Sequence, residues 1–153
     1  MTKPLPSNLP IGYWLKKVDQ LLTDRINQIQ AANGVSRLEW QILNTLFEKA
    51  GASKEELDAI LAPFTDIAAL GNILAHFAEL NWLDVSNNDE GTIIYHLSSE
   101  GKQRHQRVFQ AQQAARALAM KGITAEAYAI VIGTLQQMAT NLEMIETLAD
   151  NQS

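Results

Sequence analysis

The sequence predicts a mainly α-helical protein in which one β-hairpin separates four helices from two more. Apolar residues recur at steps of three and four over most of the 153 residues, which is the period of an amphipathic helix. Only between residues 82 and 98 does the pattern change, to two short β-compatible runs around a polar turn. We therefore expect the element order H-H-H-H-β-β-H-H.

The composition excludes several classes of protein. Cysteine is absent, which removes disulfides, thiolate zinc sites, nucleophilic cysteines and thiol-based redox sensing. Hydrophobic residues make up 46% and charged residues 19%, and no apolar run has the length of a membrane span or signal peptide. The formal charge of −5 offers no general attraction to DNA or to an anionic membrane. We expect a cytoplasmic protein that does not bind membranes.

Two helices are predicted in the first third of the chain. The first runs from residue 11 to about 30 and ends at Asn33-Gly34, where glycine suits a left-handed C-terminal turn. Ser36 with Glu39 three residues later forms a capping box that opens the second helix, and Ala50-Gly51 closes it. Its expected core face consists of Leu38, Ile42, Leu43, Leu46 and Phe47.

A second capping box, Ser53 with Glu56, opens a short third helix that Pro63 terminates. The fourth helix follows at once, from about residue 66 to 80. Its spacing predicts that these side chains face the core: Ile67, Leu70, Ile73, Leu74 and Phe77.

The predicted strands cover residues 83–86 and 92–97, with the turn at 87–91 between them. Trp82 is expected to anchor this hairpin to the fourth helix. The fifth helix is predicted from Lys102 to about Lys121. Thr124 then caps a last helix whose apolar residues continue to Leu148.

Short helices followed by a hairpin are the plan of a winged helix-turn-helix, in which the second helix of the turn motif enters the DNA major groove. We expect this module at residues 35–101, after an extended segment at 1–10. Residues 11–34 and 102–150 are expected to form a helical dimerisation arm, because their apolar surface exceeds what one small module covers. The expected dimerisation residues are Leu15, Val18, Leu22, Val131, Leu135, Leu142 and Ile145.

The chain resembles the MarR family of transcriptional regulators. Residues 35–43 resemble its "Leu-Thr-x-x-Gln-Trp-x-x-Leu" motif, 77–83 its "Leu-Glu-x-x-Gly-Leu-Val" motif, and 95–101 its "x-x-Leu-Thr-x-x-Gly" end of the wing. Residues 123–143 resemble the usual final dimerisation helix. The resemblance implies a homodimer that binds palindromic double-stranded DNA. It also implies release from DNA when a small, often aromatic, ligand enters between the dimer arm and the winged module.

The expected DNA-reading surface departs from the family pattern. Residues 65–72 contain no arginine, and the wing turn carries Asp89 and Glu90 where the family has an arginine. Three basic residues stand against eleven acidic ones over residues 36–101, a formal charge of −8, whereas DNA affinity rests largely on neutralised phosphates. The candidate DNA contacts are Thr65, Ala68, Asn72, His76, Asn87, Asn88, Lys102 and Arg104.

Two functions therefore remain open. The first is a regulator of MarR type with weakened or atypical DNA binding. The second is a relative that has lost direct DNA binding and acts through a protein partner or as a small-molecule-binding module. Fold-level analogy does not choose between them.

Four aromatic residues are candidates for lining a ligand pocket, although core packing explains them as well: Tyr13, Trp14, Trp40 and Phe47. The histidines, His76, His96 and His105, lack metal-ligand spacing and are read as ordinary surface or half-buried side chains. We find no phosphate loop, no catalytic triad order and no carboxylate–histidine metal set. The sequence predicts no enzyme activity, metal or cofactor.

Overall fold

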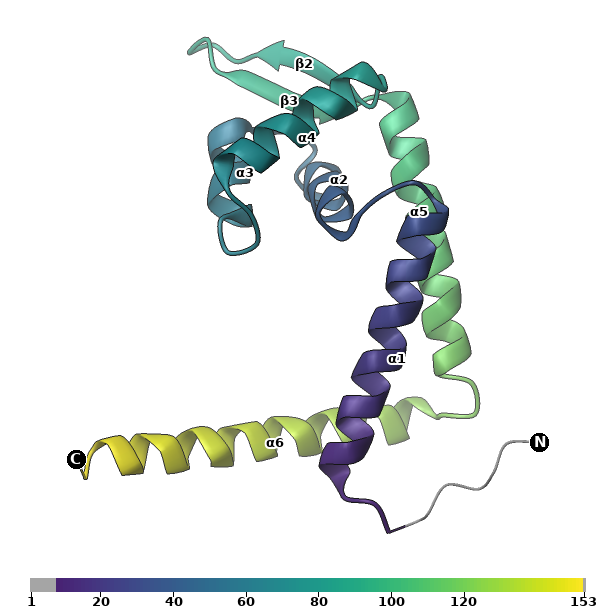
Figure 1. Ribbon diagram of the computed structural model, residues 1–153, viewed down its shortest axis with the longest axis vertical. Helices are drawn as coiled ribbons and strands as arrows, with labels where there is room; N and C mark the ends of the chain where they lie inside the picture. The colour runs from purple at the N-terminus through teal and green to yellow at the C-terminus, as the bar shows by residue number, and fades with distance from the viewer. Residues whose placement is uncertain (1–7, 153) are drawn as a thin grey trace. The chain divides into compact units, whose positions relative to one another are not determined.

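A computed structural model gives the fold of residues 8–152 (Figure 1). It confirms the predicted order of helices and hairpin and adds one two-residue strand. The predicted extended segment 1–10 lies mostly outside the described residues. The elements are α1 (Ile11–Ala32), α2 (Arg37–Lys49), β1 (Ala52–Ser53), α3 (Lys54–Leu61), α4 (Ile67–Glu79), β2 (Leu83–Asn87), β3 (Ile93–Leu97), α5 (Ser99–Ala119) and α6 (Ala125–Asp150).

The chain divides into two compact units, and the boundary lies within α5, between Ala115 and Arg116. The first unit contains α1, the winged module and most of α5. The second contains the end of α5 and α6. The first turns of α5 therefore belong to the same compact unit as the predicted module of residues 35–101.

Side-chain caps begin α2, α3 and α6 at the predicted places. Ser36 Oγ accepts a hydrogen bond from the Glu39 amide at 3.2 Å, and Ser53 Oγ accepts one from the Glu56 amide at 3.1 Å. Thr124 Oγ1 caps α6 in the same way, at 3.0 Å from the Ala127 amide nitrogen. Each cap satisfies an amide that has no partner within its helix, which fixes where the helix starts.

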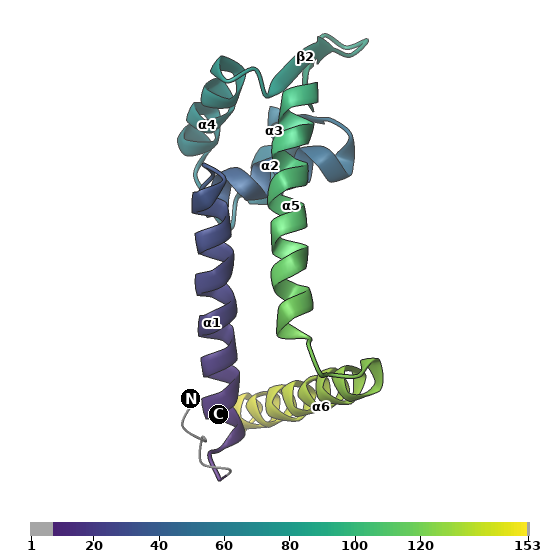
Figure 2. The same ribbon diagram turned by 90° about the vertical axis from the view of Figure 1, so that its right-hand side faces the viewer.

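The hairpin forms the centre and one edge of a three-stranded antiparallel sheet in the order β1-β3-β2. Tyr95 lies opposite Val85 on one side and Ala52 on the other. Sequence analysis missed β1, because two residues carry no readable alternation of apolar and polar side chains. Both views show the hairpin projecting past the helices of the module (Figures 1 and 2).

One hydrophobic core joins α2, α3, α4, the sheet and Val108 of α5. The Phe77 and Trp82 rings lie 5.1 Å apart, which confirms that Trp82 anchors the hairpin to α4. A Cβ at Gly101 would collide with the Trp82 carbonyl oxygen, so this position needs glycine. The core residues are Val35, Ile42, Leu43, Leu46, Ala52, Leu57, Leu61, Leu70, Leu74, Phe77, Trp82, Leu83, Leu97 and Val108.

Three predictions of detail were wrong. Ile67 was expected inside but is 64% exposed at the first position of α4. Phe47 was expected in the core but is 51% exposed and stacks on a side chain of α5. The fifth helix begins at Ser99 rather than Lys102, since Ser98 Oγ accepts a hydrogen bond from the Gly101 amide at 3.1 Å.

The second unit buries very little. No residue of α6 is buried, although much of the helix is apolar.

None of the helices within residues 8–152 is long and apolar enough to cross a membrane.

Candidate functional site

The outer face of α4 carries three of the predicted DNA contacts. Ala68, Asn72 and His76 follow one another at four-residue steps, so they lie along one side of the helix, and all three are exposed. Thr65 precedes the helix, is half-buried, and donates its hydroxyl to the Asp66 carbonyl at 3.4 Å. Asp66 itself caps α4, accepting from the Ala69 amide at 2.7 Å. This face offers one amide and one imidazole as hydrogen-bonding groups.

The wing supplies two more of the predicted contacts. Asn87 ends β2 and is exposed. The side-chain oxygen of Asn88 accepts hydrogen bonds from the amides of Glu90 and Thr92, at 3.0 and 2.9 Å. Asn88 therefore shapes the turn rather than projecting freely from it. The exposed tip of the wing is left with the carboxylates of Asp89 and Glu90.

The two predicted contacts on α5 have different surroundings. Lys102 is exposed. Arg104 is half-buried: its Nη1 donates to the Asn33 carbonyl at 2.9 Å, and its guanidinium lies 5.1 Å from the centre of the Trp82 ring. Its guanidinium thus links the C-terminal end of α1 to the base of the wing. Nothing in the sequence near Arg104 indicated this role, because Asn33 is 71 positions away.

The electrostatics of the module match its composition. From residue 55 to 101, which includes most of α3, all of α4 and the wing, the sequence contains no lysine or arginine. Two of the module's three basic residues are paired: Lys49 Nζ lies 3.7 Å from a Glu56 oxygen, and Lys54 Nζ lies 3.4 Å from an Asp58 oxygen. The outer face of α4 and the wing therefore carry no positive side chain.

The four predicted ligand-pocket residues do not come together. Tyr13 and Trp14 touch each other edge to face, with ring centres 5.3 Å apart, near the start of α1. Trp40 and Phe47 lie on α2, which follows the other end of α1, and a helix of 22 residues is about 33 Å long. Tyr13 lines a pocket of about 390 Å³ on α1, together with Lys16, Lys17, Gln20 and Leu21. Of the candidates on α2, Trp40 and Phe47 both stack on one ring of α5.

A histidine that sequence analysis read as ordinary lies between these two rings. The His105 ring stacks on Trp40 and Phe47 with ring centres 4.9 and 4.1 Å apart, and the residue is only 3% exposed. Its Nε2–H donates to the Asn44 side-chain oxygen, 2.9 Å away, and Asn44 donates to Glu48 at 3.1 Å. Burial lowers the pKa of His105, and the nearby Glu48 carboxylate partly opposes that effect. The neutral imidazole therefore holds α5 against α2.

The predicted dimerisation residues present apolar surface to solvent. On α1, Leu15, Val18 and Leu22 share one side of the helix and are each at least 40% exposed. On α6, Val131, Leu142 and Ile145 are each more than half exposed, while Leu135 is half-buried. The α6 residues follow a spacing of four, seven and three, which is the heptad pattern of helices that pair.

Comparison with solved structures identifies the fold. YusO from Bacillus subtilis matches 85% of this chain and 92% of its own, with a TM-score of 0.72 and 16% identity. A mutant of MepR from S. aureus, bound to an oligodeoxyribonucleotide, matches 88% and 99%, with a TM-score of 0.69 and 10% identity.

A third neighbour is a mutant of MarR from E. coli complexed with operator DNA. It matches 85% of this chain and 94% of its own, with a TM-score of 0.61 and 19% identity. No protein-family model and no curated protein sequence matches the chain. Across its α1-to-α6 order, three-stranded sheet and wing, the chain has the winged-helix fold of the MarR-family regulators.

Proposed function

We propose that this protein is a homodimeric transcriptional regulator of MarR type that binds double-stranded DNA weakly or in an atypical way and responds to a small aromatic ligand. The observation that carries the proposal is the exposed α4 face with Ala68, Asn72 and His76, next to a wing, in a fold whose solved neighbours include DNA complexes. A regulator of this kind acts in the cytoplasm, where it meets the DNA.

The charge of the module is the reason for expecting weak binding. A protein gains DNA affinity by replacing condensed counterions with lysine and arginine, and it loses affinity where carboxylates meet phosphates. Asn72 and His76 can donate to phosphates or base edges, but neither supplies a fixed positive charge. Lys102, exposed at the start of α5, is the nearest cation after the wing in the sequence.

The exposed leucines, valines and isoleucine of α1 and α6 support the homodimer. Each helix leaves a long apolar stripe uncovered, and a stripe of that kind is unfavourable in water unless another surface covers it. A second copy of the chain supplies an identical stripe, which satisfies the symmetry of an isologous interface.

The pair of rings on α2 supports ligand binding. Trp40 is half-buried, and Phe47 is half-exposed where it stacks on His105. A flat aromatic molecule could compete for the Phe47 face by the same offset stacking. A ligand there would act on the packing of α5 against α2.

Fluorescence anisotropy of the purified protein with labelled DNA from its own upstream region tests DNA binding directly. A scrambled duplex is the control, and both duplexes are titrated at several salt concentrations. We expect the upstream duplex to bind at least about tenfold tighter than the scrambled one, with affinity falling as salt rises. Absence of binding at low salt would refute the DNA-binding part of the proposal.

Charge reversal at the wing tip tests whether the wing approaches DNA. Changing Asp89→Arg and Glu90→Arg together should raise non-specific affinity at low salt by about tenfold, because repulsion becomes attraction. The matched control is Glu143→Arg with Glu146→Arg on α6, which makes the same change in net charge. An equal rise in both double variants would show a general charge effect and no role for the wing.

A second candidate function follows from a specific observation, the lack of any lysine or arginine from residue 55 to 101. In that case the module has lost direct DNA binding and acts through a protein partner or as a small-molecule-binding module. The anisotropy titration separates the two candidates, since only the first requires a preference for the upstream duplex.

A further inference from the structure

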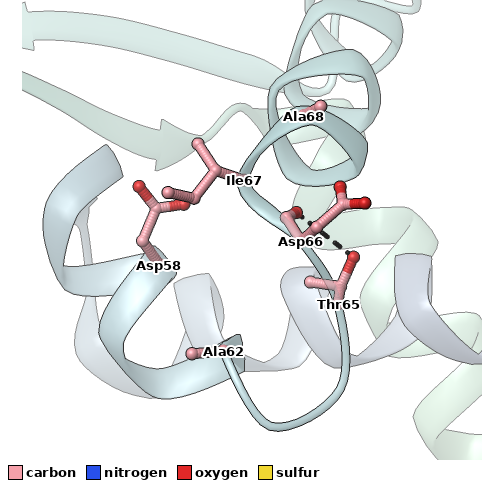
Figure 3. A pocket seen from close by; sticks show the side chains of 6 residues that line it. All are labelled: Asp58, Ala62, Thr65, Asp66, Ile67 and Ala68. Atoms are coloured by element: carbon pink, nitrogen blue, oxygen red, sulfur yellow. Dashed lines mark hydrogen bonds between the residues drawn. The ribbon is translucent and has the colours of Figure 1, made fainter.

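A pocket lies at the corner between α3 and α4, on the helix-turn-helix part of the module (Figure 3). Its volume is about 490 Å³, and it is lined by Asp58, Ala62, Thr65, Asp66, Ile67 and Ala68. All six belong to α3, to the first turn of α4 or to the loop between them, so the pocket is formed by this module alone.

Exposed apolar side chains surround the same corner. Ile67 lines the pocket and is 64% exposed, and Phe64 in the α3–α4 loop is 65% exposed. Ile60, near the end of α3, is 41% exposed. Large exposed apolar side chains that lie close together are more common at interaction surfaces than on the rest of a protein surface.

Two carboxylates flank the apolar wall. Figure 3 shows Asp58 and Asp66 on either side of Ile67, one from α3 and one from the start of α4. One oxygen of Asp58 lies 3.4 Å from Lys54 Nζ, whereas the other is shielded from water and has no hydrogen-bond partner among the described residues. The negative charge of Asp58 is thus incompletely compensated at the pocket wall.

We propose that this α3–α4 pocket docks a protein segment in which an arginine or lysine is flanked by apolar side chains. The proposal rests on the partner-binding candidate described above and names the chemistry of that partner. The cation meets Asp58 and Asp66, and the apolar neighbours cover Phe64 and Ile67. Arginine or lysine pairs there by charge, because one Asp58 oxygen already lies beside Lys54 and one Asp66 oxygen caps α4.

Charge complementarity disfavours a DNA phosphate as the occupant of this pocket. A phosphate placed there would meet two carboxylates and no cation other than Lys54, which is already paired with Asp58. The two carboxylates attract a basic peptide but repel a phosphate. Burial of the peptide's apolar side chains against Phe64 and Ile67 adds further binding free energy.

The test uses a short fluorescent peptide with a central Leu-Arg-Leu-Leu-Arg run, titrated into the full-length protein. Two control peptides replace either both arginines with glutamate or all the leucines with serine. We expect the first peptide to bind and each control to bind at least about tenfold more weakly, because charge and apolar contact both contribute.

Paired variants locate the site. Asp58→Asn should weaken the arginine peptide about tenfold, whereas Glu90→Gln, which removes the same charge at the wing tip, should change it less than about twofold. Ile67→Gln should weaken it about fivefold, and Ile93→Gln, at an exposed apolar position of β3, should leave it unchanged. The peptide should also shift the amide signals of Ala62 and Ala68 in a nitrogen–proton NMR spectrum.

Equal losses in Asp58→Asn and Glu90→Gln would overturn the proposal, because they would reduce the binding to diffuse attraction by an acidic protein. Lack of binding at peptide concentrations up to about 1 mM would overturn it as well. The DNA titration gives an independent result. Specific DNA binding without peptide binding supports the regulator and rejects the docking pocket. Peptide binding without specific DNA binding supports the docking pocket and rejects the DNA-binding regulator.

Discussion

The winged module and α6 are both rich in apolar residues, but the module buries many of them whereas α6 leaves them exposed. In the module, side chains from six helices and strands pack with Val108 of α5 into one core, and Phe77, Ile42 and Leu70 have no exposed surface. In α6, Leu142, Ile145 and others remain more than half exposed. The difference shows that apolar periodicity indicates that a face needs covering but does not tell what covers it.

The largest expected effect comes from opening a cavity in the module. Phe77→Ala should lower the free energy of unfolding by about 3–5 kcal/mol, because it removes a fully buried ring that contacts Trp82. Equilibrium unfolding in urea measures this loss. The control, Leu118→Ala at a position 69% exposed, should cost no more than about 0.5 kcal/mol. Similar losses in the two variants would abolish the contrast between core and surface.

The next effect concerns the uncovered stripe of α6. Leu142→Asp should convert the proposed dimer to monomer, since a charge would then be buried at the interface. Light scattering after size exclusion gives the mass directly. Thr140→Asp introduces the same charge outside the apolar heptad positions and should leave the dimer intact. A wild-type protein that is monomeric from the start would show that α6 is covered by something other than a second copy.

The smallest expected effect is on pH dependence where α5 packs against α2. Burial lowers the pKa of His105 in the folded protein below its ordinary value of 6.5. As the pH falls through 6.5, His105 is therefore protonated in the unfolded chain before it is protonated in the folded protein. The free energy of unfolding decreases over this range and levels off below the folded-state pKa.

Urea unfolding between about pH 5 and pH 8 measures this dependence. His105→Phe, which keeps a ring between Trp40 and Phe47, should flatten it. Phe109→Leu changes another ring near His105 but not the titrating group, and should retain it. An unchanged pH profile in His105→Phe would assign the acid sensitivity to other groups.

The helix boundaries could largely be predicted from the sequence because local chemistry sets them. Ser36, Ser53 and Thr124 each accept a hydrogen bond from an amide three residues later, and that interaction depends on no distant residue. The charge of the module could also be counted directly. From residue 55 to 101, which includes α4 and the wing, the sequence contains no lysine or arginine whatever the exact geometry.

The candidate site was harder to predict because its important contacts join distant parts of the chain. Arg104 reaches the Asn33 carbonyl across 71 positions, and His105 reaches Asn44 across 61. Both side chains look like ordinary exposed positions of a helix when α5 is read alone. Trp40 and Phe47 were chosen as a ligand-lining pair with Tyr13 and Trp14, although the length of α1 separates the two pairs.

The order of the helices and the hairpin, the starts of α2, α3 and α6, and the acidity of the module follow from the sequence alone, because caps, periodicity and charge are local properties. The packing of the elements, in contrast, places Ile67 in an exposed position at an acidic pocket and buries His105 against Trp40 and Phe47. The physical reason is that burial depends on which elements pack together, and a helical period repeats identically whether or not a neighbouring element lies against it.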